Sequence, residues 1–126
     1  MSRGILDTSV VIDLALGIEL ATMPTEATIS VVTLCELHHG VLSAGDDHRA
    51  RRLATLVAAE RRFQALPLDA RVAPHYGRMI AAARKTGRRP RTNDLLIAAT
   101  AAAHDVPVYT RDRDFLGLDG VEVVLA

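Results

Sequence analysis

The sequence has 126 residues with fifteen basic and fifteen acidic side chains, so its formal net charge is zero. Apolar residues make up 49% of the chain, but aromatic residues reach only 3% and tryptophan is absent, so Ala, Val, Leu and Ile must build the core. This length fits one compact domain over residues 1–126 and excludes two domains that each hold a covered sheet.

No apolar run is long enough to cross a membrane, and the first residues lack the charged and apolar pattern of an export signal. We therefore expect a cytosolic protein without membrane contact. Cys35 is the single cysteine, which excludes a disulfide within one chain. We expect its thiol to be buried like a small apolar side chain.

In the first half of the chain, two strands alternate with three helices. The expected elements are a strand over 4–6, a helix from residue 8 or 9 to 16, a strand over 27–30, and helices over 31–43 and 46–63. A hydroxyl of Thr8 or Ser9 should cap the first helix, and Ser30 the second. Gly17 should end the first helix. Because the first strand is short and apolar, it should lie inside the sheet.

In the second half, three strands alternate with two long helices. The expected elements are a strand over 65–68, a helix over 70–86, a helix over 93–104, and strands over 106–110 and 121–125. Asp69 and Thr92 are the expected N-caps, and Gly87 should end the first of these helices. The helix over 93–104 should be the most buried, because it is apolar on most of its surface.

This alternation of elements predicts an α/β fold. We expect a mostly parallel central sheet of four to five strands with helices on both faces. In such a sheet, ligands bind beyond the carboxyl ends of the strands. That edge is therefore the place to look for functional side chains.

Four acidic residues are predicted at that edge. Asp7 directly follows the first strand, Glu36 lies early in the helix after the second, Asp94 lies in the first turn of the apolar helix, and Asp112 follows the strand over 106–110. Any one of them could simply cap a helix or hold a turn. The apolar neighbours of Asp7 and Glu36, however, favour internal positions and a shared site.

Clustered carboxylates call for a cation. Two of them about 5 Å apart, in an effective dielectric near 20, repel each other by about 3 kcal/mol. Oxygen ligands favour Mg²⁺ or Mn²⁺, which keep coordination positions free for phosphate oxygens. One or two such ions can activate a water for displacement at phosphorus. The cluster therefore predicts metal-dependent phosphodiester hydrolysis without a Ser, His or Lys nucleophile.

The charge distribution fits a phosphate-containing substrate. Residues 71–91 hold seven basic side chains and no acidic one. If five acids including Asp114 gather in one cleft, the remaining surface carries a balance of +5. A basic rim around an acidic hole suits a nucleic-acid backbone, although the same residues could form ordinary solvated helix faces. The candidate RNA contacts are Arg84, Lys85, Arg88, Arg89, Arg91 and Arg111.

Four segments, in this order along the chain, resemble the PIN-domain nucleases, and within them the VapC-type toxins of toxin-antitoxin operons. The segments are Ile-Leu-Asp-Thr-Ser-Val at 5–10, Ser-Val-Val-Thr-Leu-Cys-Glu-Leu at 30–37, Thr-Asn-Asp-Leu-Leu-Ile-Ala at 92–98 and Thr-Arg-Asp-Arg-Asp-Phe at 110–115. Each is short, but the ordered set is specific. The resemblance implies endonucleolytic cleavage of RNA with Mg²⁺ or Mn²⁺, and a cognate antitoxin encoded alongside.

The resemblance also implies roles for individual residues. Asp7 and Asp94 would be the principal metal ligands, and Glu36 and Asp112 would complete the catalytic set. Asp114 would be a fifth ligand or a supporting group. The hydroxyls of Ser9 and Thr110 would orient a carboxylate or a metal-bound water. A homodimer through apolar helical surface is a further expectation.

Other readings of the acids remain. A phosphatase with an aspartyl nucleophile would need a second acid where Ser9 stands, and a phosphorylation-receiver domain would need a lysine other than Lys85 near the acids. His38 and His39 could bind zinc with Glu36, although neighbouring helix positions diverge by about 100°.

Two non-enzymatic readings also stay open. Basic residues with His75 and Tyr76 could bind RNA without cutting it, and such a protein should tolerate the loss of Asp94. Alternatively, the carboxylates could hold a structural ion in a protein-interaction module. The RNA target and the choice between Mg²⁺ and Mn²⁺ are open as well.

Overall fold

A five-stranded sheet with strand order β3-β2-β1-β4-β5 forms the centre of the molecule. The computed structural model describes residues 2–126, and all four strand pairs in it are parallel. The elements in chain order are β1 (Arg3–Leu6), α1 (Thr8–Ala15), β2 (Glu26–Ser30), α2 (Val31–Ser43), α3 (Asp46–Arg62), β3 (Ala65–Leu66), α4 (Val72–Lys85), α5 (Thr92–Ala103), β4 (Val108–Thr110), the 3₁₀ turn η1 (Arg113–Phe115) and β5 (Val123–Leu125). The predicted α/β fold is confirmed, with β3, β4 and β5 shorter than expected.

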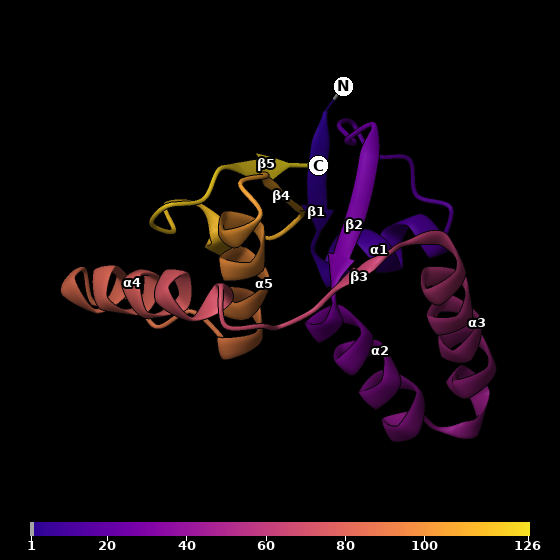
Figure 1. Ribbon diagram of the computed structural model, residues 1–126. Helices are drawn as coiled ribbons and strands as arrows, with labels where there is room; N and C mark the ends of the chain where they lie inside the picture. The colour runs from indigo at the N-terminus through magenta and orange to yellow at the C-terminus, as the bar shows by residue number, and fades with distance from the viewer. Residues whose placement is uncertain (1) are drawn as a thin grey trace.

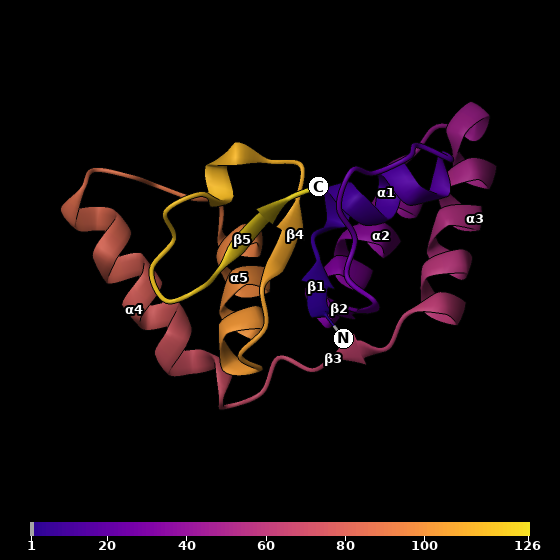
Figure 2. The same cartoon turned by 90° about the horizontal axis from the view of Figure 1, so that it is seen from above.

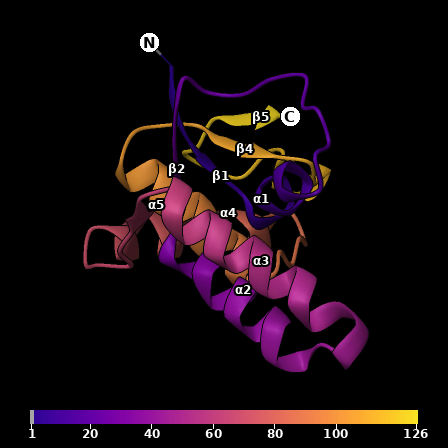
Figure 3. The same ribbon diagram turned by 90° about the vertical axis from the view of Figure 1, so that its right-hand side faces the viewer.

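Helices cover both faces of the sheet. Helices α4 and α5 lie on one side of the strands, and α1, α2 and α3 lie on the other (Figures 1 and 2). Figure 3 shows α2 and α3 running side by side on the second face. None of the helices in residues 2–126 is both long and apolar enough to cross a membrane.

The first strand, β1, lies in the middle of the sheet. It pairs with β2 on one side and with β4 on the other, and Ile5 and Leu6 are fully buried. These two residues point to opposite faces, because side chains alternate along a strand. Ile5 joins the core under α4 and α5, whereas Leu6 joins the core under α1, α2 and α3. The predicted internal position of this strand is confirmed.

Helix α5 closes one of the two cores. Its buried residues include Ile97, Ala98, Ala99 and Ala101, all with no exposed surface. Small alanine side chains let the helix lie close to the strands, and larger residues such as Met79 and Phe115 fill the space around it. The predicted burial of this helix is confirmed, and it fixes the position of Asp94 in the first turn.

The helix caps differ in part from the prediction. Ser30 accepts a hydrogen bond from the amide of Val32, as expected. Helix α1, however, is capped by Asp7 instead of Thr8 or Ser9, because the helix begins directly after the strand. Arg71 and Arg91, instead of the predicted Asp69 and Thr92, occupy the N-cap positions of α4 and α5, and neither provides a side-chain cap. The side chain of Asp69 does accept the amide of Arg71 at 3.1 Å, in the turn that leads into α4.

The prediction for Cys35 was wrong, because its side chain is exposed. Val32, Thr33 and Leu37 are the buried residues of α2. Cys35 lies two positions before Leu37, which places it about 200° around the helix from that buried side chain.

We predict that Gly4→Ala destabilises the fold. A Cβ on this buried strand residue would overlap the ring of Tyr109 and lie 3.2 Å from the carbonyl oxygen of Pro107. Because Tyr109 is itself buried, relief requires a shift of the core, at a cost of about 1–3 kcal/mol. Urea unfolding measures the loss.

Gly77→Ala is the matched control, since a Cβ there meets no atom within 4 Å. It lies on helix α4, where alanine should stabilise by about 0.5–1 kcal/mol. Equal stabilities of the two variants would contradict the close packing described at Gly4.

Candidate metal-binding active site

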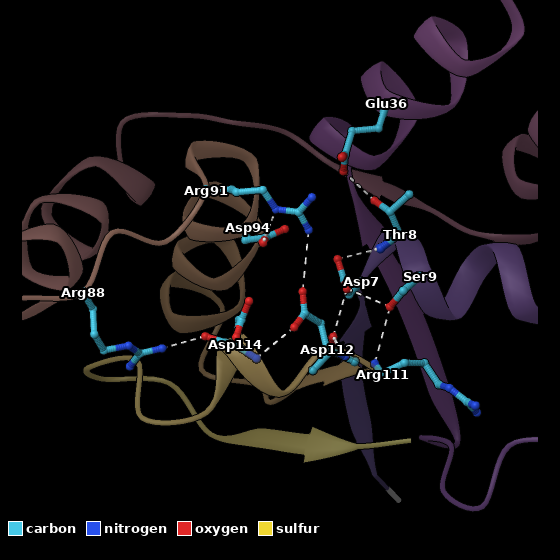
Figure 4. Close-up of polar contacts among 11 residues, drawn as sticks. Asp7, Thr8, Ser9, Glu36, Arg88, Arg91, Asp94, Arg111, Asp112 and Asp114 are labelled. Carbon is cyan, nitrogen blue, oxygen red and sulfur yellow. Dashed lines mark hydrogen bonds and ion pairs between the residues drawn. The ribbon is translucent and has the colours of Figure 1, made fainter. Parts of the chain in front are cut away.

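Acidic side chains from four chain segments meet at the carboxyl edge of the sheet. Asp7 follows β1, Glu36 lies on α2, Asp94 lies in the first turn of α5, and Asp112 follows β4. Figure 4 shows these carboxylates around a common space, with Arg91 among them. The structure thus brings together the four residues that the sequence singled out.

Asp7 is the most firmly held of the four carboxylates. Its side chain is nearly fully buried, with 4% of the residue exposed. One carboxylate oxygen accepts the amide of Thr8 at 2.8 Å, and the other accepts the hydroxyls of Ser9 at 2.8 Å and Thr110 at 2.9 Å. Three donors therefore fix its orientation without any metal ion.

Thr110 connects two of the acidic residues. Its buried hydroxyl donates to Asp7 and accepts the amide of Asp112 at 2.9 Å. The carboxylate of Asp112 in turn accepts the amide of Asp114 at 2.8 Å and so caps η1. Asp114 itself is exposed at the edge of the site. The end of β4 is thereby tied to the end of β1.

Glu36 is positioned by two threonines that the sequence analysis missed. The hydroxyl of Thr8 donates to Glu36 at 2.6 Å and lies 2.9 Å from the hydroxyl of Thr33. The available signal was helical spacing, because Thr33 precedes Glu36 by three positions and shares its face of α2. Glu36 is therefore held against the first turn of α1 although it is only half-buried.

Asp94 is buried beside other acids and one arginine. Burial raises the pKa of Asp94 above its ordinary value of 3.8, and the charges of Asp7 and Asp112 raise it further, while Arg91 lowers it. Arg91 contacts Asp94 at 3.1 Å and Asp112 at 3.6 Å. Asp94, with smaller contributions from Asp112 and Glu36, raises the pKa of Arg91. A residue expected at the RNA-binding rim thus lies among the carboxylates.

Two hollows flank Arg91. One has a volume of about 270 Å³ and is lined by Arg88, Arg89, Pro90, Arg91, Asp94 and Asp114. The other, of about 250 Å³, is lined by Glu36, Arg91, Thr92, Asn93 and Asp94. Arg91 and Asp94 line both hollows, so the acidic site is open to solvent.

The donors suit Mg²⁺ or Mn²⁺, since they are carboxylate oxygens supported by hydroxyl groups. Within residues 2–126, however, no three acidic or histidine side chains converge closely enough to hold an ion as they stand. The guanidinium of Arg91 bridges two of the acids. The donor chemistry thus fits a divalent cation, and the side chains must close around it.

The basic residues expected to contact RNA fall into two groups. Arg84, Arg88 and Arg89 line a hollow of about 180 Å³ together with Tyr76, next to the acidic site. Lys85 is exposed at the end of α4. Arg88 is anchored by a 2.7 Å hydrogen bond to the carbonyl oxygen of Asp114.

Arg111 forms the second group. Its guanidinium pairs with Asp13 of α1 at 3.2 Å. Figure 4 shows the Arg111 side chain pointing away from the carboxylates. The imidazole of His38 lies near Glu60 at 3.9 Å, so its nearest acidic partner is on α3 instead of being Glu36. This contact gives no support to a zinc site on α2.

We predict that Asp94→Asn stabilises the metal-free protein at pH 7. The fold raises the pKa of Asp94, so the folded state holds this proton to a higher pH than the unfolded state does. The free energy of unfolding therefore falls as the pH rises from 3.8, the ordinary pKa, through the raised pKa of the folded state. Urea unfolding in EDTA should show a gain for the variant at pH 7 that shrinks as the pH falls toward 3.8.

Asp69→Asn is the control with the opposite sign. Its hydrogen bond with Arg71 lowers the pKa of this exposed carboxyl, so neutralising it should slightly destabilise the protein at pH 7. A loss of stability for both variants would show that the contact of Asp94 with Arg91 outweighs the cost of burial.

Comparison with known proteins shows the family to which this chain belongs. The PIN domain family model matches residues 5–121. Ribonuclease VapC5 of Mycobacterium tuberculosis is 45% identical over 98% of this chain and 93% of its own length. Ribonuclease VapC4 of the same organism is 39% identical over 97% of this chain and 95% of its own.

A solved structure is similar over the whole chain. It is the crystal structure of VapBC-5, a member of the VapBC family of toxin-antitoxin systems from M. tuberculosis, with a TM-score of 0.86, 43% identity and full coverage of both chains. The family match spans the segments that carry Asp7, Glu36, Asp94 and Asp112. The chain therefore belongs to the PIN-domain family and, within it, to the VapC proteins.

Proposed function

We propose that this protein is a metal-dependent endoribonuclease that acts as the toxin of a toxin-antitoxin pair. The observation that carries the proposal is the meeting of Asp7, Glu36, Asp94 and Asp112 at one edge of the sheet, with Asp7 already oriented by three donors. The relatives named ribonuclease support RNA as the substrate.

Mg²⁺ or Mn²⁺, when bound, would supply an activated water and neutralise charge on the scissile phosphate. Asp7 and Asp94 are the most buried acids of the site and would be the principal ligands. Glu36 and Asp112 would complete the set, and Asp114 would support it at the exposed edge. The hydroxyls of Ser9 and Thr110 both donate to Oδ2 of Asp7 and so fix the orientation of this carboxylate. No side-chain nucleophile is needed.

The basic rim would hold the RNA backbone. Arg88 is fixed beside the acids by its bond to the carbonyl oxygen of Asp114, and Arg89 lines the same hollow. Arg84 and Lys85 would extend this positive surface along the end of α4. Such contacts position the phosphates without reading the bases. Arg111 would join them only after leaving Asp13.

We predict that purified, antitoxin-free protein cuts total cellular RNA into discrete fragments with Mg²⁺ or Mn²⁺ and not with EDTA. Asp94→Asn should slow cleavage more than about a hundredfold, because it removes a ligand. Gel analysis or end sequencing of the RNA gives both the rate and the target.

Asp69→Asn is again the control, since this exposed acid lies outside the carboxylate cluster and should leave cleavage unchanged. Binding of RNA without cleavage under every metal condition would contradict the proposal and favour a binding module. Survival of activity in a folded Asp94→Asn protein would do the same.

The antitoxin would bind a groove between α1, α2 and α3. The groove has a volume of about 520 Å³ and is lined by Thr8, Ile12, Leu16, Glu36, Leu37, Gly40, Arg51, Arg52 and Thr55. Its apolar residues include Ile12 and Leu16, which are 40% and 53% exposed. Because Glu36 lines both this groove and the hollow beside Asp94, an occupant would reach the acidic site. The solved relative in a VapBC system supports such a partner.

This groove favours an antitoxin segment with apolar side chains for Ile12 and Leu16 and acidic ones for Arg51 and Arg52.

The predicted homodimer would need separate apolar surface. Leu42 and Leu53, which are 80% and 47% exposed on α2 and α3, offer it. RNA and a newly made antitoxin both occur in the cytosol, which is where this function would operate.

We predict that Ile12→Glu with Leu16→Glu weakens binding to the product of the adjacent antitoxin gene by at least about tenfold, since each change places a charge on apolar contact surface. Calorimetry on purified proteins measures the affinity, and RNA cleavage by the variant should persist. Leu68→Glu is the control, because Leu68 is similarly exposed, at 46%, but lies outside the groove. Equal effects of both changes would rule the groove out.

A further inference from the structure

The side chain of Arg91 lies where a cation is needed. Its Nε is 3.1 Å from Oδ2 of Asp94, and its Nη2 is 3.6 Å from Oδ2 of Asp112. These two acids come from α5 and from the end of β4, so the guanidinium bridges separate parts of the fold (Figure 4). Glu36 on α2 is close enough that its charge also raises the pKa of Arg91.

A divalent metal ion would need the same oxygens. Mg²⁺ binds carboxylate oxygens at about 2.0–2.1 Å, so an ion that bridges Oδ2 of Asp94 and Oδ2 of Asp112 would occupy the space that the guanidinium now fills. In the present arrangement of residues 2–126, the acids do not converge on a common ion. Arg91 and a metal ion therefore compete for one position.

Arg91 can leave that position easily. Its side chain is 78% exposed, and exposed ion pairs are weak. It is the N-cap residue of α5, yet its side chain makes no cap hydrogen bond that movement would break. Asp94 and Asp112, by contrast, are 11% and 29% exposed and stay behind when the guanidinium swings into solvent.

We propose that Arg91 is an internal counter-ion that occupies the acidic site in the absence of metal and sets the metal affinity by being displaced. This inference rests on the proposed metal-dependent function. It assigns Arg91 a positioning role toward the carboxylates, distinct from that of the basic residues on the rim. Arg89, two residues earlier, makes no ion pair among the described residues and offers a charge-matched comparison.

The test is calorimetric titration of metal-free protein with Mn²⁺. Arg91→Gln should bind Mn²⁺ about threefold to tenfold more tightly than wild type, because a competing cation is removed. Arg89→Gln should stay within about twofold of wild type, since it removes the same charge without breaking a contact to an acid. Unchanged or weaker binding by Arg91→Gln would overturn the inference.

Thermal unfolding gives a second readout that does not depend on activity. In EDTA, Arg91→Gln should have a lower Tm than wild type, because the acids lose their counter-ion. In saturating Mn²⁺ the difference should close, because the ion takes over that role. A deficit of equal size under both conditions would mean that Arg91 is only a structural contact, and would overturn the inference.

Asp94→Asn separates this inference from the proposed function. If wild type binds Mn²⁺ and Asp94→Asn does not, the metal site stands, and Arg91→Gln alone decides the role of Arg91. Two results would contradict both the metal site and the inference. One is that neither wild type nor Arg91→Gln binds Mn²⁺, and the other is that Asp94→Asn leaves their Mn²⁺ binding unchanged.

Discussion

The site depends on a buried carboxylate at the end of the central strand. Asp7 receives donors from the start of α1 and from Thr110, which lies 103 positions further along the chain. The main-chain amide of Asp7 also donates to the carbonyl oxygen of Tyr109 at 2.9 Å. The bonds to Thr110 and Tyr109 form only when β1 and β4 are paired. Pairing of the two strands and orientation of the Asp7 carboxylate are therefore coupled, since a buried carboxylate without its donors would lower the stability of the fold.

The fold holds like charges together and partly compensates for the repulsion. Burial and the neighbouring acids raise the pKa of Asp94, and Arg91 opposes that effect without cancelling it. The protein thus gives up stability at the carboxyl edge of the sheet, as functional sites commonly do. The two apolar cores, which meet at Ile5 and Leu6 of β1, lie behind this edge and keep the strands in register. Destabilising charges are tolerated because they are confined to the end of a well-packed sheet.

Sequence reasoning succeeded where one physical signal dominates. Alternating apolar segments gave the parallel sheet and its helices, and the acids that follow the strands came together because parallel strands end at the same edge. It was wrong about the N-cap positions of α1, α4 and α5, because the pattern of residue types fixes a helix boundary only to within one or two residues, and each observed cap lies one or two residues from the predicted one. It also could not place long side chains. Arg91 and Arg111 are both expected at the rim, but one bridges two carboxylates while the other pairs with Asp13.

Under the proposed function, metal, RNA and antitoxin would all act through one corner of the molecule. Thr8 and Glu36 line the groove between α1, α2 and α3, and the 2.6 Å hydrogen bond between them also positions Glu36 at the acidic site. Glu36 and Arg91 in turn line the hollow beside Asp94. An occupant of the groove that contacts Thr8 or Glu36 would therefore alter the carboxylate set directly, with no need for a change elsewhere in the fold. Inhibition would then be competition at shared side chains, because the groove and the acidic site have Glu36 in common.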